Sequence, residues 1–381
     1  MRSQPSENGS FKVTVAVSVL LLIALVFSGL GFFFRTALQA YQPANTTRVI
    51  IEIPKGKSPP AIARQLEAMQ VIRNHTIFLY YGKLKGSWAR AKAGEYELSP
   101  SMSPSQILAI LESGLSVSHP FLIREGENSY EVAADIEAKG FGPKEKFLKL
   151  SRDASFISSL GLLPPPKSLE GYLFPDTYML QRKMSQEDIL RAMVKRFQAA
   201  WGANEEQRAR ELGLTRDQVI TLASIVEKET GAPEERPIIS GVFHNRLRKK
   251  MRLQSDPTSI YGIWSRYRGK IHRSDLMEMN PYNTYMIPGL PVGPISNPGN
   301  TAMQATLNPA EHHYLYFVSQ NNGTHIFTAT YEEHSRAVTK FQLDPKAREG
   351  KSWRDLKSRS VLPSPLPNLA SPLKKSPTRS R

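Results

Sequence analysis

The stretch VIIEIPKGKSPPAIARQLEAM, residues 49–69, joins three local patterns that decide the fold of the N-terminal part of the chain. The apolar residues of 49–53 predict a short strand, the segment with Pro and Gly after it predicts a turn, and 61–69 has the spacing of an amphipathic helix. The pattern returns seventy residues further on, because IPKG at 53–56 matches IREG at 123–126 and a similar helix follows both. The sequence therefore predicts a duplicated small α+β unit.

The rest of the first copy is a strand and a capped helix. AGEYELSP at 93–100 alternates as a strand does, and MSPSQILAILESG at 102–114 has a Ser-Pro start and a Gly end. Ser103 is the expected N-cap of this helix. We expect residues 48–116 to form the first small unit and residues 117–161 to form a second unit or a connector.

Residues 13–34 are uncharged and mostly apolar, over a length close to the roughly 20 residues that a helix needs to cross a membrane. A cleaved signal peptide is the alternative, but the run is longer than a typical signal-peptide core and no clear cleavage site follows it. We expect an uncleaved single-pass anchor in the cytoplasmic (inner) membrane. Arg2 and Lys12 precede the anchor, so the positive-inside rule favours 1–12 as a cytoplasmic tail and the rest of the chain in the periplasm.

A proline cluster, LLPPPKSLEGYLFPDTY at 162–178, breaks the small-unit pattern. We place a larger mixed domain at 162–343, so that the predicted fold class is α+β. The run NPYNTYMIPGLPVGPISNPG at 280–299 has no regular periodicity, and loops of this length in compact domains are usually functional. The regular elements predicted in this domain are helices over 186–201, 216–230 and 300–309 and a strand hairpin within 313–330 that turns at Asn-Gly.

Charge and cysteine content restrict the partners and the chemistry. The formal charge is +16, but +8 of it comes from residues 346–381, a basic segment rich in Pro and Ser of the kind that is usually disordered. Such a tail is sometimes a nucleic-acid arm, but we expect no nucleic-acid partner. The chain has no cysteine, which excludes disulfides, thiolate catalysis and thiolate metal sites.

Two carboxylates end the helix predicted over 216–230, in the sequence LASIVEKETGAP at 222–233. At 100° per residue Glu227 and Glu229 point about 160° apart, so they cannot share one environment. Ile and Val lie one turn before Glu229, whereas Ala and Ser lie one turn before Glu227. Apolar surroundings and the negative end of the helix dipole raise a carboxyl pKa toward the range of a general acid. Periodicity alone leaves open that both are solvated surface acids.

Other catalytic signatures are absent from the sequence. It has no H-E-x-x-H zinc motif, no G-x-S-x-G elbow and no glycine loop for phosphate or dinucleotide binding. We therefore expect neither a metal nor a cofactor. A carboxylate at a helix end, with loops rich in Asn, Gln, Tyr and Gly, provides the side-chain types that hold a sugar.

Several stretches resemble a known family, the membrane-anchored endolytic murein transglycosylases of the YceG-like type. The resemblance extends over about residues 48–340 and includes the anchor, but not the basic tail. It implies that 48–116 is a LysM-like subdomain that binds peptidoglycan and that 162–343 is the catalytic domain. The stretches that carry it are LEGYLFPDTY (169–178), ASIVEKET (223–230), NRLRKKMRLQSDPTSIYG (245–262), YNTYMIPGLPVGPISNPG (282–299) and YLYFVSQNNGTHIFTAT (314–330).

The resemblance implies a single catalytic glutamate. Glu229-Thr230 matches the pair of acid and hydroxyl residues in other lytic transglycosylases, whereas Glu227-Lys228 does not. We expect Glu229 to protonate the glycosidic oxygen between N-acetylmuramic acid and N-acetylglucosamine, and then to accept the proton of the muramoyl 6-hydroxyl as a 1,6-anhydro ring closes. Glu227 is then structural, and the reverse assignment is the alternative. The expected substrate-binding residues, each of which could instead make a structural hydrogen bond, are Glu170, Asp176, Asn245, Gln254, Asp256, Asn283 and Tyr285.

The implied function is cleavage of nascent peptidoglycan strands at the outer face of the membrane, which ends strand elongation. The resemblance further implies partnership with peptidoglycan synthases. The alternative from another class is a membrane-anchored scaffold without catalysis, which binds peptidoglycan through 48–116. The intact Glu229 argues against the scaffold.

Overall fold

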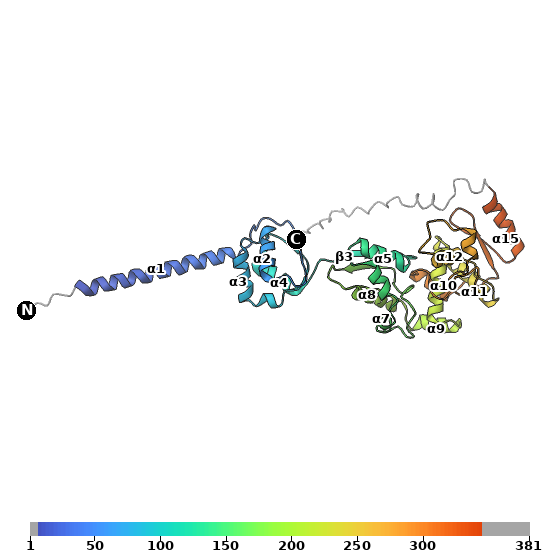
Figure 1. Ribbon diagram of the computed structural model, residues 1–381, viewed down its shortest axis with the longest axis horizontal. Helices are drawn as coiled ribbons and strands as arrows, with labels where there is room; N and C mark the ends of the chain where they lie inside the picture. Colours follow the sequence, from blue (N-terminus) through green and yellow to red (C-terminus); the bar gives the residue numbers. More distant parts are fainter. Residues whose placement is uncertain (1–6, 345–381) are drawn as a thin grey trace, which may run out of the picture. The chain divides into compact units, whose positions relative to one another are not determined.

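The computed structural model describes residues 7–344 (Figure 1). These residues divide into two compact units. The basic tail expected at 346–381 lies outside the described residues, as do the first six residues of the expected cytoplasmic tail. Within the described range, the N-terminal unit contains residues up to 122, 134–147 and 176–192, and the C-terminal unit contains 123–133, 148–175 and 193 onward.

The N-terminal unit begins with a long apolar helix, α1 (Glu7–Ala37). Its segment Val15–Ala37 is long and apolar enough to cross a membrane, and none of that segment is buried in the protein. The segment overlaps the predicted span at 13–34. A signal sequence near the N-terminus has the same length and composition, so the uncleaved anchor stays a prediction.

A two-stranded sheet and three helices form the first α+β core. Strands β1 (Val49–Ile53) and β2 (Gly94–Leu98) pair antiparallel, with Ile51 opposite Tyr96. Ile51, Ile53, Tyr96 and Leu98 alternate with more exposed residues, so one face of the sheet packs on the core. The strands and helices predicted within 49–69 and 93–114 are confirmed. The helices beside this sheet are α2 (Pro59–Ala68), α3 (His75–Leu84) and α4 (Pro104–Ser113), with a short 3-10 turn at Ser87–Ala89 (Figure 1).

The order of strand, turn and helix repeats as the sequence predicts. β3 (His119–Leu122) is followed by Gly126, whose φ of 79° matches the 84° of Gly56 after β1. Both turns need a left-handed backbone, which glycine adopts at low cost. The second copy continues through α5 (Ser129–Ala138) and α6 (Lys144–Leu150).

The partner strand of β3 lies beyond the proline cluster. β4 (Thr177–Leu180) pairs antiparallel with β3, with Phe121 opposite Tyr178. Residues 176–192 therefore belong to the N-terminal unit, so the boundary that we drew at residue 162 does not coincide with a boundary between compact units. The four residues of β4 are too few for their alternation to indicate a pairing so distant in sequence.

Helix α10 (Arg216–Glu229) is the central element of the C-terminal unit. It is buried from Val219 to Glu227, because apolar or small residues occupy nearly all of these positions. The Thr215 side chain accepts a hydrogen bond from the Gln218 N–H and completes the predicted capping box. The helices that contact α10 are α9 (Ala203–Glu211), α11 (Arg236–Arg248), α12 (Asp256–Gly262) and α14 (Asn300–Leu307). The helices after residue 150 that are not in this set are α7 (Ala154–Ser158), α8 (Gln186–Ala200), α13 (Arg273–Met277) and α15 (Tyr331–Val338).

The long loop at 280–299 is held by hydrogen bonds rather than by regular structure. The Asn297 side-chain oxygen accepts from the N–H groups of Gly171 (2.9 Å) and Leu173 (3.0 Å), and its amide nitrogen donates to the Glu127 carbonyl (2.9 Å). Asn297 is fully buried. One amide group therefore joins three segments of the C-terminal unit.

The predicted hairpin is confirmed after this loop. β5 (Tyr316–Ser319) and β6 (His325–Thr328) pair antiparallel, with Val318 opposite Ile326. The turn between them contains Gly323 in a left-handed conformation, at a φ of 96°.

Candidate active site

Glu229 is the last residue of α10, where its side chain is half-buried. Burial raises the pKa of Glu229 to about 7, and the negative charge of Asp256 adds to this rise. The Ser255 hydroxyl, which donates to Glu229 Oε1, and the Arg246 guanidinium both oppose it. Near pH 7 both protonation states are therefore populated, which a group needs if it is to give and then accept a proton.

The Arg246 guanidinium is fixed by backbone carbonyls. Its Nε donates to the Leu315 carbonyl (2.6 Å) and Nη1 donates to the Leu253 carbonyl (2.7 Å), and the group lies 5.4 Å from the centroid of the Tyr316 ring. Burial lowers the pKa of Arg246, while the negative charge of Glu229 acts in the opposite direction. A fixed cation thus influences Glu229 without taking its proton.

Asp256 and Tyr285 form the other side of the site. The Tyr285 hydroxyl donates to Asp256 Oδ1 at 2.6 Å. Burial and this hydrogen bond raise the pKa of Tyr285, so the hydroxyl remains a donor. Thr284 joins the same two segments, because its Oγ1 accepts from the Ser255 N–H (3.0 Å). Of the predicted site residues, Asp256 and Tyr285 are the ones that the structure brings to Glu229.

Glu227 has a different environment. Its Oε1 accepts from Arg236 Nη2 at 2.6 Å, and both side chains of this ion pair are buried. Its Oε2 accepts from the Gly299 N–H at 3.0 Å, at the start of α14. Both oxygens of Glu227 therefore have hydrogen-bond partners within the protein.

Asn245 and Asn283 support the site from within the protein. The amide nitrogen of Asn245 donates to the carbonyls of His312 (2.8 Å) and Tyr314 (3.0 Å). Asn283 Nδ2 donates to three carbonyls at the end of α13, the shortest bond being 2.7 Å to Glu278, and its Oδ1 accepts from Ser259 and from the Tyr285 N–H. Both are buried. Their side chains therefore position backbone, which is the structural alternative that the sequence left open.

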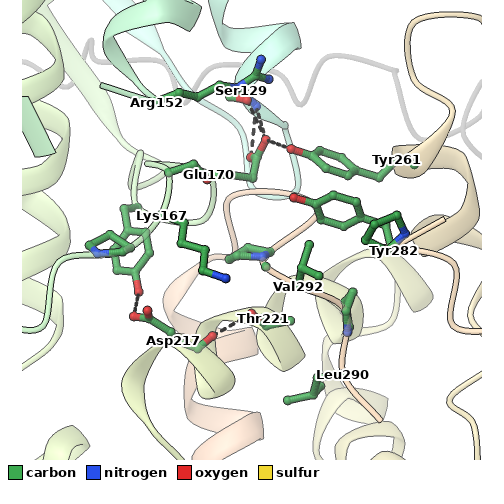
Figure 2. A pocket seen from close by; sticks show the side chains of 18 of the residues that line it. Ser129, Arg152, Lys167, Glu170, Asp217, Thr221, Tyr261, Tyr282, Leu290 and Val292 are labelled. Atoms are coloured by element: carbon green, nitrogen blue, oxygen red, sulfur yellow. Dashed lines mark hydrogen bonds between the residues drawn. The ribbon is translucent and has the colours of Figure 1, made fainter. Parts of the chain in front are cut away.

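The other three predicted residues lie in different settings. Gln254 has an exposed side chain and a positive φ of 50°, directly before Ser255. Asp176 belongs to the N-terminal unit, where its Oδ1 accepts from the Thr177 N–H (2.7 Å). Glu170 is buried in the wall of a cavity, where Ser129 and Tyr261 donate to its carboxylate (Figure 2).

Sequence reasoning missed Ser255 and Arg246. Ser255 is the N-cap residue of α12, and its position before Asp256-Pro257 indicates the start of a helix. This local pattern does not predict the hydrogen bond to Glu229, which lies 26 residues away in sequence. Arg246 lies within a stretch that resembles the family, but no spacing relates it to Glu229. Among the described residues, no group of three His, Cys, Asp or Glu side chains could hold a metal ion.

Comparisons with known proteins place the chain in a family. The YceG-like family matches residues 51–340, and the chain belongs to this family. It is similar to an endolytic murein transglycosylase of Bacillus subtilis, with 33% identity over 83% of this chain and 91% of that protein. It is also similar to an endolytic murein transglycosylase of Streptococcus pneumoniae, with 30% identity over 84% of this chain and 64% of that protein.

A solved structure supports the fold. The crystal structure of a YceG-like protein from Listeria monocytogenes is 36% identical in sequence and aligns with a TM-score of 0.54. The alignment covers 76% of this chain and 98% of that structure. The mixed α+β class predicted from the sequence is thereby confirmed.

Proposed function

We propose that this chain is a peptidoglycan lytic transglycosylase in which Glu229 moves the proton. The general activity is supported by the relatives that carry the name endolytic murein transglycosylase. The observation that carries the assignment is the setting of Glu229, a half-buried carboxyl group whose pKa burial raises to about 7. The rest of the mechanism and the cellular role extend this proposal.

In the proposed first step, protonated Glu229 gives its proton to the glycosidic oxygen between N-acetylmuramic acid and N-acetylglucosamine. The bond between that oxygen and the muramoyl C1 breaks, and positive charge develops at C1. The ionised Glu229 then accepts the proton of the muramoyl 6-hydroxyl while that oxygen bonds to C1. The product is a 1,6-anhydro ring, no water is consumed, and Glu229 is protonated again.

This route explains why one acid is enough. Ordinary glycosidases use two carboxylates, one of which supplies the nucleophile or activates water. Here the attacking group belongs to the substrate. Asp256 is the second acid at the site, and its oxygen is engaged by Tyr285 at 2.6 Å. We assign Asp256 to electrostatic stabilisation of the developing positive charge.

The proposed cellular role depends on the anchor and on the small N-terminal unit. With α1 as a single-pass anchor and its N-terminus in the cytoplasm, the catalytic unit works in the periplasm at the surface of the cytoplasmic membrane. The β1-α2-α3-β2 arrangement would act as the LysM-like unit that binds peptidoglycan. Cleavage of nascent strands at this surface would end their elongation, beside the peptidoglycan synthases.

The test is a digest of purified peptidoglycan by the full chain in detergent, followed by mass spectrometry of the products. We expect 1,6-anhydromuramoyl ends, which disappear with Glu229→Gln and persist with Glu227→Gln in proportion to the folded protein. Reducing ends from the unmodified chain would instead identify a hydrolase, with Asp256 as the second carboxylate. Binding without any cleavage would favour the alternative, a membrane-anchored scaffold.

A further inference from the structure

A cavity of about 550 Å³ lies in the C-terminal unit, apart from the residues that surround Glu229 (Figure 2). Neither Glu229, Ser255 nor Asp256 lines it. Its volume falls within the roughly 300–1,000 Å³ that is usual for small-molecule sites in proteins. The mechanism proposed above leaves this cavity without a role.

The upper wall of the cavity in Figure 2 is preformed by hydrogen bonds. Glu170 is only 2% exposed, and its carboxylate accepts from the Ser129 N–H (3.0 Å), the Ser129 hydroxyl (2.6 Å) and the Tyr261 hydroxyl (2.8 Å). Tyr261 in turn packs edge-to-face on Tyr282, with the ring centroids 4.7 Å apart. Two aromatic rings are therefore held in place before any ligand arrives, as in sites that bind with little reorganisation.

The cavity also contains an uncompensated positive charge. Lys167 makes no hydrogen bond or ion pair with any residue in the range 7–344, and its side chain extends into the cavity in Figure 2. Arg152 is a second cation, 5.0 Å from the centroid of the Tyr130 ring, but the Glu170 carboxylate in the same cavity wall offsets its charge. The charge of Asp217, on the opposite wall, is paired with Arg216 at 3.1 Å. This distribution favours an anionic group of a ligand over a cationic one.

Two helices lead from the cavity to Glu229. On α10, Gln218 lines the cavity and Glu229 ends the helix. Eleven residues separate them, which places them about 20° apart around the helix and about 16 Å apart along it. On α12, Tyr261 lines the cavity while Asp256 faces Glu229. Because α10 itself is buried between these two places, a polymeric ligand that reaches both passes over the segments that cover the helix.

We propose that this cavity is a second binding site for the glycan strand, in which Lys167 binds a carboxylate of the strand beside the Tyr261 and Tyr282 wall. The inference rests on the proposed function, since it takes the substrate to be peptidoglycan. The carboxylate belongs either to the attached peptide or to the lactyl group of a muramoyl residue from which the peptide is absent. An enzyme that cuts within a strand benefits from a second binding site, because binding there fixes the strand at a distance from the bond that breaks.

The test measures binding to the full chain in detergent, with Glu229→Gln present throughout to prevent turnover. The probes are a tetrasaccharide of peptidoglycan with its peptides attached and the same tetrasaccharide after the peptides are removed. Lys167→Glu is compared with Lys195→Glu, because Lys195 is also exposed and lies outside the cavity. We expect Lys167→Glu to raise the Kd of at least one probe by up to about fivefold, since one surface ion pair contributes up to about 1 kcal/mol. We expect Lys195→Glu to leave both values unchanged.

The two probes separate the two carboxylates. A loss confined to the probe with peptides assigns the site to a peptide carboxylate, and a loss confined to the bare tetrasaccharide assigns it to the lactyl group. The inference is overturned if Lys167→Glu and Lys195→Glu give the same Kd for both probes. Failure of the proposed function would give a different result. The unmodified chain would then form no 1,6-anhydro products, while Lys167→Glu would still weaken binding of the probes.

With Glu229 restored, the same substitution has a kinetic signature. Binding of the strand at a distance from Glu229 contributes to substrate affinity and not to proton transfer. Lys167→Glu should therefore raise KM and leave kcat within about twofold. A fall in kcat at unchanged KM would contradict a binding role.

Discussion

The two carboxylates at the end of α10 are two residues apart in sequence and belong to different chemical environments. Glu227 is held by Arg236 at 2.6 Å and by the Gly299 N–H at 3.0 Å, and its ion pair is closed to solvent. Glu229 accepts from one hydroxyl, that of Ser255, and burial raises its pKa to about 7. The difference arises because a helix turns residues two apart to nearly opposite sides.

The comparison teaches that burial alone does not make a catalytic acid. Glu227 is the more buried of the two, but a guanidinium and a backbone N–H fully engage it. Glu229 keeps part of its surface open, and its neighbours do not fix its charge. A proton donor needs an environment in which its two states are similar in free energy.

The largest effect is expected on the rate of cleavage. Glu229→Gln removes the proton donor while preserving the shape of the side chain, so the rate of formation of 1,6-anhydro ends should fall by about 10²- to 10⁴-fold. The check is a timed digest with products quantified by mass spectrometry. Equal losses in Glu229→Gln and Glu227→Gln, measured on equal amounts of folded protein, would remove the distinction between the two acids.

The next effect is on the stability of the Glu227 pair. Arg236→Met leaves Glu227 buried without its cation, and breaking such a pair typically costs about 3–5 kcal/mol. The thermal unfolding midpoint should therefore fall markedly. The double variant Glu227→Met with Arg236→Met should recover part of the loss, because no unpaired charge remains. A midpoint unchanged in Arg236→Met would show that the pair is not structural.

A third effect separates the two acids by the sign of the stability change. The folded chain raises the pKa of Glu229 from the ordinary 4.5 to about 7, so the protonated form is favoured by folding. This stabilisation is complete below pH 4.5 and is lost as the pH rises through 7. At pH 8, Glu229→Gln should raise the free energy of unfolding by about 1–3 kcal/mol, whereas Glu227→Gln should lower it. Unfolding of both variants at pH 4 and pH 8 provides the check, and a destabilised Glu229→Gln at pH 8 would contradict the assignment.

The smallest effect concerns the neighbours of Glu229. Asp256→Asn removes a negative charge and so should lower the pKa of Glu229, which moves the alkaline limb of the pH–rate profile to lower pH by about one unit or less. Ser255→Ala removes a hydrogen bond to the ionised form and should move that limb in the opposite direction. The profile of kcat against pH measures both shifts. Shifts in the same direction would mean that the two residues do not act through Glu229.

Much of the fold could be predicted from local patterns. The strand–turn–helix repeat, the Thr215 cap and the Asn-Gly hairpin each depend on residues close in sequence, and all three are present. The helical periodicity of α10 also separated Glu229 from Glu227. These features need only the geometry of a single element.

Pairings between distant segments were not accessible in the same way. The β3–β4 pairing joins segments almost 60 residues apart across a proline cluster, and the Ser255–Glu229 contact joins a loop to the end of a helix. Asn245 and Asn283 show a second limit. Amide side chains suit sugars and backbone carbonyls equally well, so their type could not reveal that three-dimensional packing directs them to carbonyls.

The side chain of Asn297 also has a consequence for the order of folding. Its three partners precede it by 124 to 170 residues along the chain. While the chain is being synthesised, residues 123–175 lack the group that completes their hydrogen bonds until more than half of the C-terminal unit has been made. Contacts of such long sequence separation slow folding, because a long loop must close before they form. A unit closed by its last long loop is expected to fold after synthesis, as one late and concerted event.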